Sequence, residues 1–207
     1  MRKLKLVLFI AIILSVATSF AQEQKPKLFV GIIVDQMLVD YLYRFESKFS
    51  ENGFKRLLKD GFFNKNTHYN YVPTYTGPGH ASVYSGTTPE THGIIANDWY
   101  NRTLDKKINC VDDSTVTLVG GDEIAKKSYS PINLLSSNFA DELKIASQGN
   151  AKVVGVSIKN RGAILPSGHL PNGAYWYDGN TGNFVTSTYY MDQLPEWVDK
   201  FNKKKKS

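Results

Sequence analysis

The chain has 207 residues, of which 25 are Lys or Arg and 19 are Asp or Glu, giving a formal net charge of +6. Much of this excess lies at the ends, in Arg2, Lys3, Lys5 and lysines 203–206, which leaves 18 cations against 19 anions in the body. A nearly neutral body without a basic stripe argues against a nucleic-acid partner. The single cysteine, Cys110, excludes an internal disulfide framework and a zinc site built from cysteines.

The first residues have the pattern of a secretory signal peptide. Basic residues precede an apolar run over residues 6–20, and Ser19 and Ala21 occupy the −3 and −1 positions of a cleavage site. A transmembrane anchor is the alternative, but the run is shorter than the roughly 20 residues that span a bilayer. We expect a signal peptide over residues 1–21, a polar leader over residues 22–26, and a mature chain that is periplasmic or secreted and not membrane-bound.

The next segment predicts a central strand that ends at a carboxylate. Residues 28–34 are a continuous apolar run, typical of a strand buried on both faces in a parallel sheet, and Asp35 follows directly. Ligands of open α/β sheets bind beyond the carboxyl ends of the strands, so Asp35 is a candidate functional residue. Its alternative role is to cap the following turn.

The remaining pattern is that of an α/β protein. Helical spacing covers residues 41–45 and 54–58, the latter ended by Gly61, and a further helix over residues 139–146 precedes a second buried strand at residues 153–158. Aromatic residues 174–177 and 184–190 flank turn residues 178–182, which predicts a β-hairpin. We therefore expect a mostly parallel central sheet flanked by helices, with an added aromatic hairpin.

A threonine precedes a proline near the start of a predicted helix. Thr76 is followed by Gly77 and Pro78, and proline suits the first turn of a helix, where its missing N–H would be unpaired in any case. The exposed amides of such a turn attract anions, so Thr76 could act as a nucleophile if a cation generated its alkoxide. The alternative is a threonine N-cap.

Two cations follow the second predicted strand. Lys159 and Arg161 would point to the same side of an extended chain and could hold one anion at the end of that strand. Arginine offers a bidentate fork and lysine a point charge, which together suit a phosphoryl group. A pair of ordinary surface cations is the alternative.

Four segments resemble the ordered motifs of bacterial alkaline phosphatases in the type I phosphodiesterase and nucleotide pyrophosphatase family: residues 31–37, 76–80, 91–97 and 157–165. The resemblance extends from about residue 28 to residue 197 and corresponds to the N-terminal part of a family member. It implies a two-zinc phosphohydrolase with Thr76 as nucleophile and with Asp35 and Thr76 at the zinc. Asn97, Lys159 and Arg161 would contact the phosphoryl oxygens of a small phosphate ester.

The resemblance is partial, because the family's other zinc ligands come from later segments. None of the twelve Asp residues is followed by His at the next or the fourth position. Residues 27–200 are therefore interpreted as the N-terminal part of a catalytic domain, and residues 201–207 as a basic tail at a truncation or frameshift. Three functions stay open: a zinc-dependent monoesterase, a phosphodiesterase or nucleotide pyrophosphatase of the same family, and an inactive anion-binding remnant.

The other residues capable of metal chemistry receive local roles. We expect His68, His80, His92 and His169 to make nearby hydrogen bonds rather than bind zinc, and Cys110 to fill a small space near a loop. The pattern leaves the oligomeric state open.

Overall fold

The computed structural model describes residues 26–121 and 128–204. The expected signal peptide, residues 22–25 of the leader and residues 205–207 of the basic tail lie outside the described residues. The chain divides into two units, residues 1–34 and residues 35–207, each of which is described by itself. No helix within the described ranges is long and apolar enough to cross a membrane.

The strand predicted over residues 28–34 is wrong for this structure. In the described part of the first unit the backbone forms no strand, and the side chains are largely exposed, with Leu28 and Ile32 each 77% accessible. A strand needs a hydrogen-bonded neighbour, and this segment enters no ladder among the described residues. The apolar run indicated a buried strand, but it carries no information on whether another strand lies beside it.

The second unit begins with three short helical segments. They are α2 (Asp40–Arg44), the 3₁₀-helix η1 (Glu46–Lys48) and α3 (Phe54–Asp60), and none contains a buried residue. Gly61 follows α3 directly, as predicted. The two predicted helical stretches are thus present, each within a residue or two of the expected bounds.

The main sheet is mixed, so the prediction of a mostly parallel sheet is wrong. Its strands β3 (Leu118–Val119), β6 (Asn183–Ser187), β5 (Gly173–Asp178) and β4 (Val154–Ser157) lie in that order. Only β4 and β5 pair in parallel; β5 pairs antiparallel with β6, and β6 with β3. A short turn between β5 and β6 reverses the chain, whereas the connection from β4 to β5 contains a helix and allows parallel pairing.

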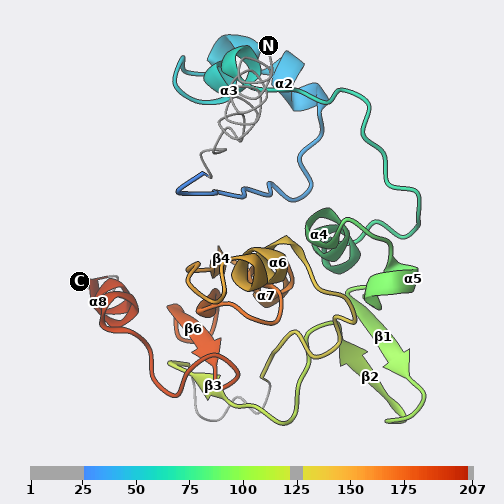
Figure 1. Ribbon diagram of the computed structural model, residues 1–207, viewed down its shortest axis with the longest axis vertical. Coiled ribbons are helices and arrows are strands. Elements are labelled where there is room, and N and C mark those ends of the chain that lie inside the picture. The colour runs from blue at the N-terminus through green and yellow to red at the C-terminus, as the bar shows by residue number, and fades with distance from the viewer. Residues whose placement is uncertain (1–25, 122–127, 205–207) are drawn as a thin grey trace, which may run out of the picture. The chain divides into compact units, whose positions relative to one another are not determined.

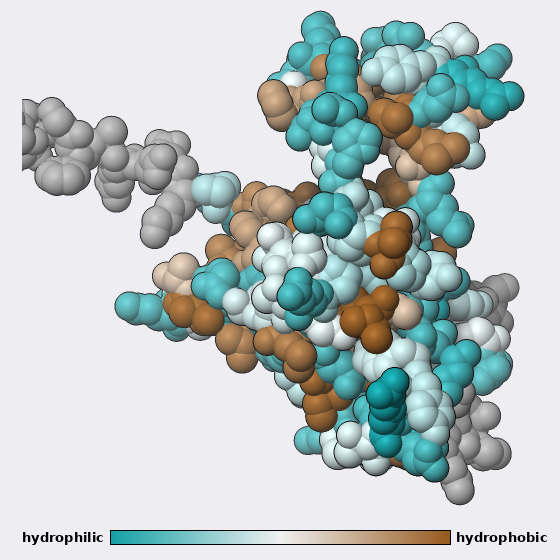
Figure 2. Space-filling model, turned by 90° about the vertical axis from the view of Figure 1, so that its right-hand side faces the viewer, coloured by the Kyte–Doolittle hydropathy of each residue, from teal (hydrophilic) through white to brown (hydrophobic). Residues whose placement is uncertain are grey.

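Among the described residues of the second unit, strand β4 lies at the edge of the sheet and exposes the side chains of one face, so the predicted burial of residues 153–158 is wrong. Val154, Val156 and Ile158 are 54%, 59% and 75% exposed, while Gly155 and Ser157 are partly covered. Alternate residues point to opposite faces, and helix α7 (Asn160–Ser167) covers only the face of Gly155. Apolar surface is also visible on the face of the molecule shown in Figure 2.

The core lies where α7 packs against the sheet and against helix α4 (Thr76–Ser85). Glycines bring these elements close together: a Cβ on Gly155 would overlap Ser167 Oγ and the Ala163 carbonyl of α7. Helix α6 (Phe139–Ala146) also contacts α7, and the helices lie together in Figure 1. The buried core comprises Ala81, Ile94, Cys110, Val111, Leu134, Ala163, Ile164, Leu165, Ala174, Trp176 and Val185.

Smaller elements complete the second unit. Helix α5 (Pro89–His92) leads into an antiparallel pair, β1 (Asp98–Asn101) and β2 (Lys106–Asn109). Helix α8 (Glu196–Lys204) lies on β6, where the Asn202 amide donates to the carbonyl of Phe184 and accepts from its N–H. These two bonds hold α8 to the sheet in the manner of a short ladder.

Candidate active site at the start of helix α4

Thr76 is the first residue of α4, and the extended Tyr75 takes the N-cap position. Pro78 therefore lies in the first turn, as predicted, where a missing N–H costs nothing. The interpretation of Thr76 as an N-cap is wrong, because its backbone is already helical and its hydroxyl makes a different contact. The threonine side chain is thus held at the positive end of a helix of ten residues.

The hydroxyl of Thr76 donates a hydrogen bond to Asp35, with 2.8 Å between Oγ1 and Oδ2. The two residues are 41 positions apart in the sequence, so the contact is a tertiary one. Asp35 lies in a turn, not at the end of a strand as predicted. A carboxylate in this position orients the hydroxyl and could also ligate a cation placed beside it.

Asn97, in the bend just before β1, contacts the same turn of α4. Its Oδ1 accepts from the backbone N–H of Gly77 at 2.7 Å, which satisfies one of the unpaired amides of the helix start. Because the oxygen is engaged with Gly77, the NH₂ group of the amide points away from that bond as a donor. Thr76 and Asn97 are therefore neighbours through Gly77.

Cys110 connects Asn97 to α7. Its N–H donates to the Asn97 carbonyl at 2.9 Å, and its fully buried thiol lies against Gly77 and Arg161. Burial raises the pKa of the thiol to about 11, and the charge of Arg161 opposes part of that rise. Cys110 is the small buried residue that the sequence predicted, and it is an unreactive thiol whose position joins three segments of the site.

Arg161 brings a positive charge into this cluster, and its side chain contacts the Cys110 thiol. Its Nε and Nη1 are buried and make no hydrogen bond within the described part of the chain. Leaving a donor of a charged group buried and unsatisfied costs more than leaving a neutral one, so these two N–H groups would gain from an anionic acceptor. The guanidinium of Arg161, which lies against Cys110, therefore favours an anion beside it.

Lys159 and Arg161 were expected to point to the same side of an extended chain, and this expectation is wrong. The chain is extended only up to Lys159, which is the N-cap of α7, and Arg161 is already inside the helix. Two such positions do not share a side as they would in a strand. Lys159 is exposed, while the Arg161 side chain lies at the buried cluster, so a joint phosphate clamp stays a prediction.

The four histidines make local contacts, each with one or two nearby groups. His80 is the closest to the site, since its Nδ1 lies 2.8 Å from the carbonyl oxygen of Thr76. His68 contacts Asn66, and His92 contacts Ser82 and the N–H of Ile94. His169 contacts Asp141 and the Leu134 carbonyl at a second cluster.

The residues that the structure describes supply only some of the ligands of a metal site. Asp35 and Thr76 come together, but among residues 26–121 and 128–204 no group of three or more His, Cys, Asp or Glu side chains could hold an ion. A structural or catalytic zinc takes three or four protein ligands. These residues therefore do not fit a complete zinc site.

The tight contacts of Gly77 lead to a testable prediction. A Cβ there would lie 3.1 Å from Cys110 Sγ and 3.2 Å from both the Ala96 oxygen and Asn97 Oδ1. Two of these neighbours are held by hydrogen bonds or backbone, so we expect Gly77→Ala to reduce the free energy of unfolding by about 1–3 kcal/mol in urea titrations. In the control Gly79→Ala, the new Cβ would meet only the Tyr69 hydroxyl, at 3.8 Å. An equal loss in both variants would contradict the packing argument.

Comparison with known proteins identifies the family. The model of the type I phosphodiesterase / nucleotide pyrophosphatase family matches residues 29–205. The chain belongs to this family. The family is one of phosphoric ester hydrolases, in agreement with the resemblance seen in the motifs.

Three bacterial relatives are about half identical to the chain. They are the alkaline phosphatase PafA of Elizabethkingia meningoseptica (51% over 180 residues), a calcium-transporting ATPase of Myroides odoratus (52% over 182) and the alkaline phosphatase PhoV of Synechococcus elongatus (50% over 178). These alignments cover 87%, 88% and 86% of this chain and 33%, 33% and 32% of the relatives. The chain thus spans about a third of the length of the relatives that it matches.

The crystal structure of PafA is similar to this fold, with a TM-score of 0.83 at 50% identity over 86% of this chain and 34% of PafA. The α/β fold is therefore that of an alkaline-phosphatase-like protein. A second PafA structure carries substitutions of a threonine, an asparagine, a lysine and an arginine, separated in sequence by 21, 62 and 2 residues. It has a TM-score of 0.80 at 47% identity over 83% of this chain and 33% of PafA.

Proposed function

We propose that this chain carries the nucleophile and the phosphoryl-binding residues of an exported phosphate monoester hydrolase of the alkaline phosphatase type. The observation that carries the proposal is the series of contacts from the Thr76 hydroxyl through Gly77, Asn97 and Cys110 to the buried Nε and Nη1 of Arg161. The Thr76 hydroxyl can attack phosphorus, and the Asn97 NH₂ group and the N–H groups of Arg161 can bind negatively charged oxygen. Lys159 is proposed as a further phosphoryl contact from the N-cap of α7.

The chemistry of the proposed step follows from these roles. Thr76 Oγ1 forms a bond to phosphorus, the bond from phosphorus to the ester oxygen breaks, and the leaving oxygen takes the electron pair and, through solvent, the proton that Oγ1 gives up. Water then attacks the phosphorus of the phosphothreonine, the bond to Oγ1 breaks, and Oγ1 regains a proton as phosphate is released. The Asp35 carboxylate orients the hydroxyl, but a carboxylate is too weak a base to remove a threonine proton alone. Arg161 and the Asn97 amide would stabilise the charge that develops on the non-bridging oxygens.

The residue types replaced in the PafA mutant support the assignment. This chain has a threonine, an asparagine, a lysine and an arginine at positions 76, 97, 159 and 161, with the same separations of 21, 62 and 2 residues. These are the four residues that the sequence motifs indicate. Their recurrence at equal spacing in a protein named as an alkaline phosphatase favours the same use here.

This chain supplies only part of the ligand set of the proposed zinc site. Asp35 and the Thr76 hydroxyl are the residues that would face such an ion, and a bound zinc would supply the Lewis acid that a threonine nucleophile requires. Two ligands do not complete the site, so no step is assigned to the metal.

We expect the 207-residue chain by itself to bind less than one zinc per molecule and to hydrolyse phosphate esters far below the usual range of about 1–1,000 per second. Metal analysis of the purified protein and a steady-state assay with an aryl phosphate would measure both. The matched control is the same preparation after dialysis against a chelator. Stoichiometric zinc together with a rate in the enzymatic range would show that the two-ligand interpretation is wrong.

A phosphodiesterase is the second candidate, because the family model carries that name. The two substrates differ in one oxygen: a monoester presents three non-bridging oxygens and a dianion, whereas a diester gives one of these positions to a second organic group. Two cations and an amide suit the monoester better. An aryl phosphate and its methyl ester, compared under the same conditions, distinguish the two functions.

A further inference from the structure

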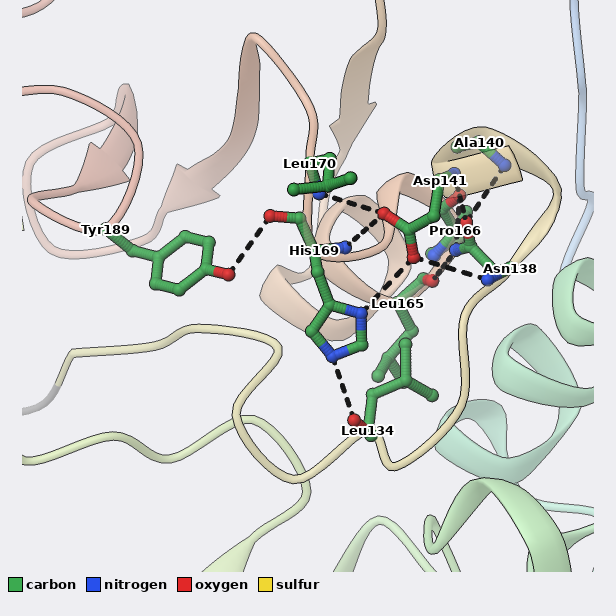
Figure 3. A network of polar contacts seen from close by, with 9 residues as sticks. All are labelled: Leu134, Asn138, Ala140, Asp141, Leu165, Pro166, His169, Leu170 and Tyr189. Atoms are coloured by element: carbon green, nitrogen blue, oxygen red, sulfur yellow. Dashed lines mark hydrogen bonds and ion pairs between the residues drawn. The ribbon is translucent and has the colours of Figure 1, made fainter. Parts of the chain in front are cut away.

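A second polar cluster lies at the other end of α7 from Arg161, around the buried carboxylate of Asp141 (Figure 3). Asp141 Oδ1 accepts from the backbone N–H groups of His169 and Leu170, at 2.7 and 2.9 Å. Its Oδ2 accepts from the Asn138 N–H at 3.2 Å and pairs with Nδ1 of His169 at 3.2 Å. Asp141 is 1% exposed, so this carboxylate is fully committed to the cluster.

Asn138 joins two helices within the cluster. Its Oδ1 caps the start of α6 by accepting from the N–H groups of Ala140 and Asp141. Its Nδ2 donates to the carbonyls of Leu165 and Pro166, at 2.9 and 3.0 Å. The last carbonyls of a helix have no partner of their own, and one side chain here satisfies two of them. The end of α7 is therefore fastened to the start of α6.

The ring of His169 faces acceptors on both sides (Figure 3). Nδ1 faces the Asp141 carboxylate, and Nε2 lies 2.9 Å from the Leu134 carbonyl oxygen. A neutral imidazole has one donor nitrogen, so only the doubly protonated ring can satisfy both contacts. The Tyr189 hydroxyl, which donates to the His169 carbonyl at 3.0 Å, holds the backbone of the same residue.

We propose that Asn138, Asp141 and protonated His169 form a clasp that positions α7, and through it the Arg161 side chain. The helix has eight residues and a length of about 12 Å, so a shift at its clasped end moves Arg161 at its other end. Gly168 shows how closely the clasp is fitted, since a Cβ there would overlap the side chains of Asp141 and Asn138. The positioning of α7 by the clasp does not depend on the proposed function, whereas the role of Arg161 in catalysis does.

The clasp should depend on pH through two groups. The hydrogen bond to Asp141 raises the pKa of His169, against the opposing effect of burial. Burial alone would raise the pKa of Asp141, but hydrogen bonds from the ring and from the amides of Leu170 and His169 lower it overall. Burial raises the pKa of both Tyr189 and Tyr190, so these stay neutral, and the charges of Asp141 and Asp113 raise the pKa of Tyr189 further.

The directions of the pKa shifts of His169 and Asp141 define the pH range in which the clasp is stable. Stabilisation from His169 is complete below its unfolded pKa of about 6.5 and is lost as the pH rises through the higher folded value. Stabilisation from Asp141 is present above its unfolded pKa of about 3.9 and is lost as the pH falls through the lower folded value. The clasp is therefore strongest between about pH 4 and 6.5.

Hydrogen exchange of the wild-type chain tests the clasp without any ligand. Protection factors of the α7 amides should fall about tenfold or more between pH 6 and 9, the equivalent of one charge-assisted hydrogen bond. The midpoint of that fall should coincide with the NMR titration of the His169 ring. Protection that stays constant through this titration would overturn the proposal, and this measurement requires no variant to fold.

Asp141→Asn then tests the link to Arg161. We expect its α7 amides to exchange about tenfold faster at pH 6, with little further change up to pH 9, and the buried Arg161 Nε–H resonance to shift. Asp113→Asn is the matched control, since Asp113 is also a buried carboxylate and accepts from Thr115 and Ser130, outside α7. An unshifted Arg161 signal in Asp141→Asn, or an equal shift in the control, would also overturn the proposal.

A third measurement separates the clasp from the proposed function. Sulfate, which stays a dianion over this pH range, serves as a probe in calorimetric titrations. If the wild-type chain binds sulfate, Asp141→Asn should weaken that binding about tenfold and Asp113→Asn should not. Absence of sulfate binding in the wild type would count against the phosphoryl-binding function, while the exchange and Arg161 signals would still decide on the clasp.

Discussion

Replacing Thr76 with Ala should abolish hydrolysis of every substrate in a complete enzyme that contains this chain. Such an enzyme can be made by exchanging the matching third of PafA for residues 22–207, which are about half identical to it. The variant keeps the helix start and loses only the hydroxyl that Asp35 orients. Loss of a nucleophile costs at least about 10³-fold in kcat, which a steady-state assay with aryl phosphates would measure.

Two further variants separate the hydroxyl from general damage. Thr76→Ser retains an oxygen at the same position and should keep measurable turnover with both monoesters and diesters. Thr74→Ala changes an exposed threonine just before α4 and should leave the rates within about twofold, because surface substitutions rarely matter. If Thr76→Ala retained a tenth of the wild-type rate, the attacking group would have to be something other than this threonine.

The helices were the most predictable part of the fold. Residues 41–45, 54–58 and 139–146 show helical periodicity in the sequence, and helices occur at those places. Their signals are local: apolar spacing and, for α3, the Gly61 that follows it. Local signals can be seen without knowledge of what packs against them.

The strands were less predictable, because a strand depends on distant neighbours. Residues 28–34 and 154–157 have similar apolar character, yet the second segment pairs with β5 and the first enters no ladder among the described residues. The direction of pairing depends on connections as well. The turn between β5 and β6 makes them antiparallel neighbours inside the main sheet, whereas the sequence suggested a hairpin added to a mostly parallel sheet. The fold class was therefore correct, and the expectation of a mostly parallel sheet was wrong.

In the candidate site, too, some features could be predicted from the sequence and others could not. Chemistry-bearing residues such as Thr76 and Arg161 could be chosen from motifs, because their side chains are suited to few tasks. The residues that bring them together could not. Cys110 was expected only to fill a small space, and Gly77 had no expected role, although their contact connects the start of α4 with Arg161. Nothing in the sequence signals a contact between positions so far apart.

Replacing Arg161 with Ala should separate the two possible activities. In the same complete enzyme, the guanidinium would contact an oxygen that a dianionic monoester offers and a diester partly replaces. A charge-assisted hydrogen bond contributes roughly 1.5–3 kcal/mol, so kcat/KM for an aryl phosphate should fall about 10- to 100-fold. The fall for its methyl ester should be several-fold smaller, which parallel assays at one pH would show.

Conservative and remote variants complete this test. Arg161→Lys keeps the charge but loses the fork of two N–H groups that lie buried and unpaired, so it should recover only part of the monoester rate. Arg102→Ala removes an exposed arginine after β1 and should change neither rate. If Arg161→Ala lowered both activities by the same factor, the guanidinium would be a general anion contact. The fork would then confer no preference for the monoester, and the phosphodiesterase would be the better description of the enzyme.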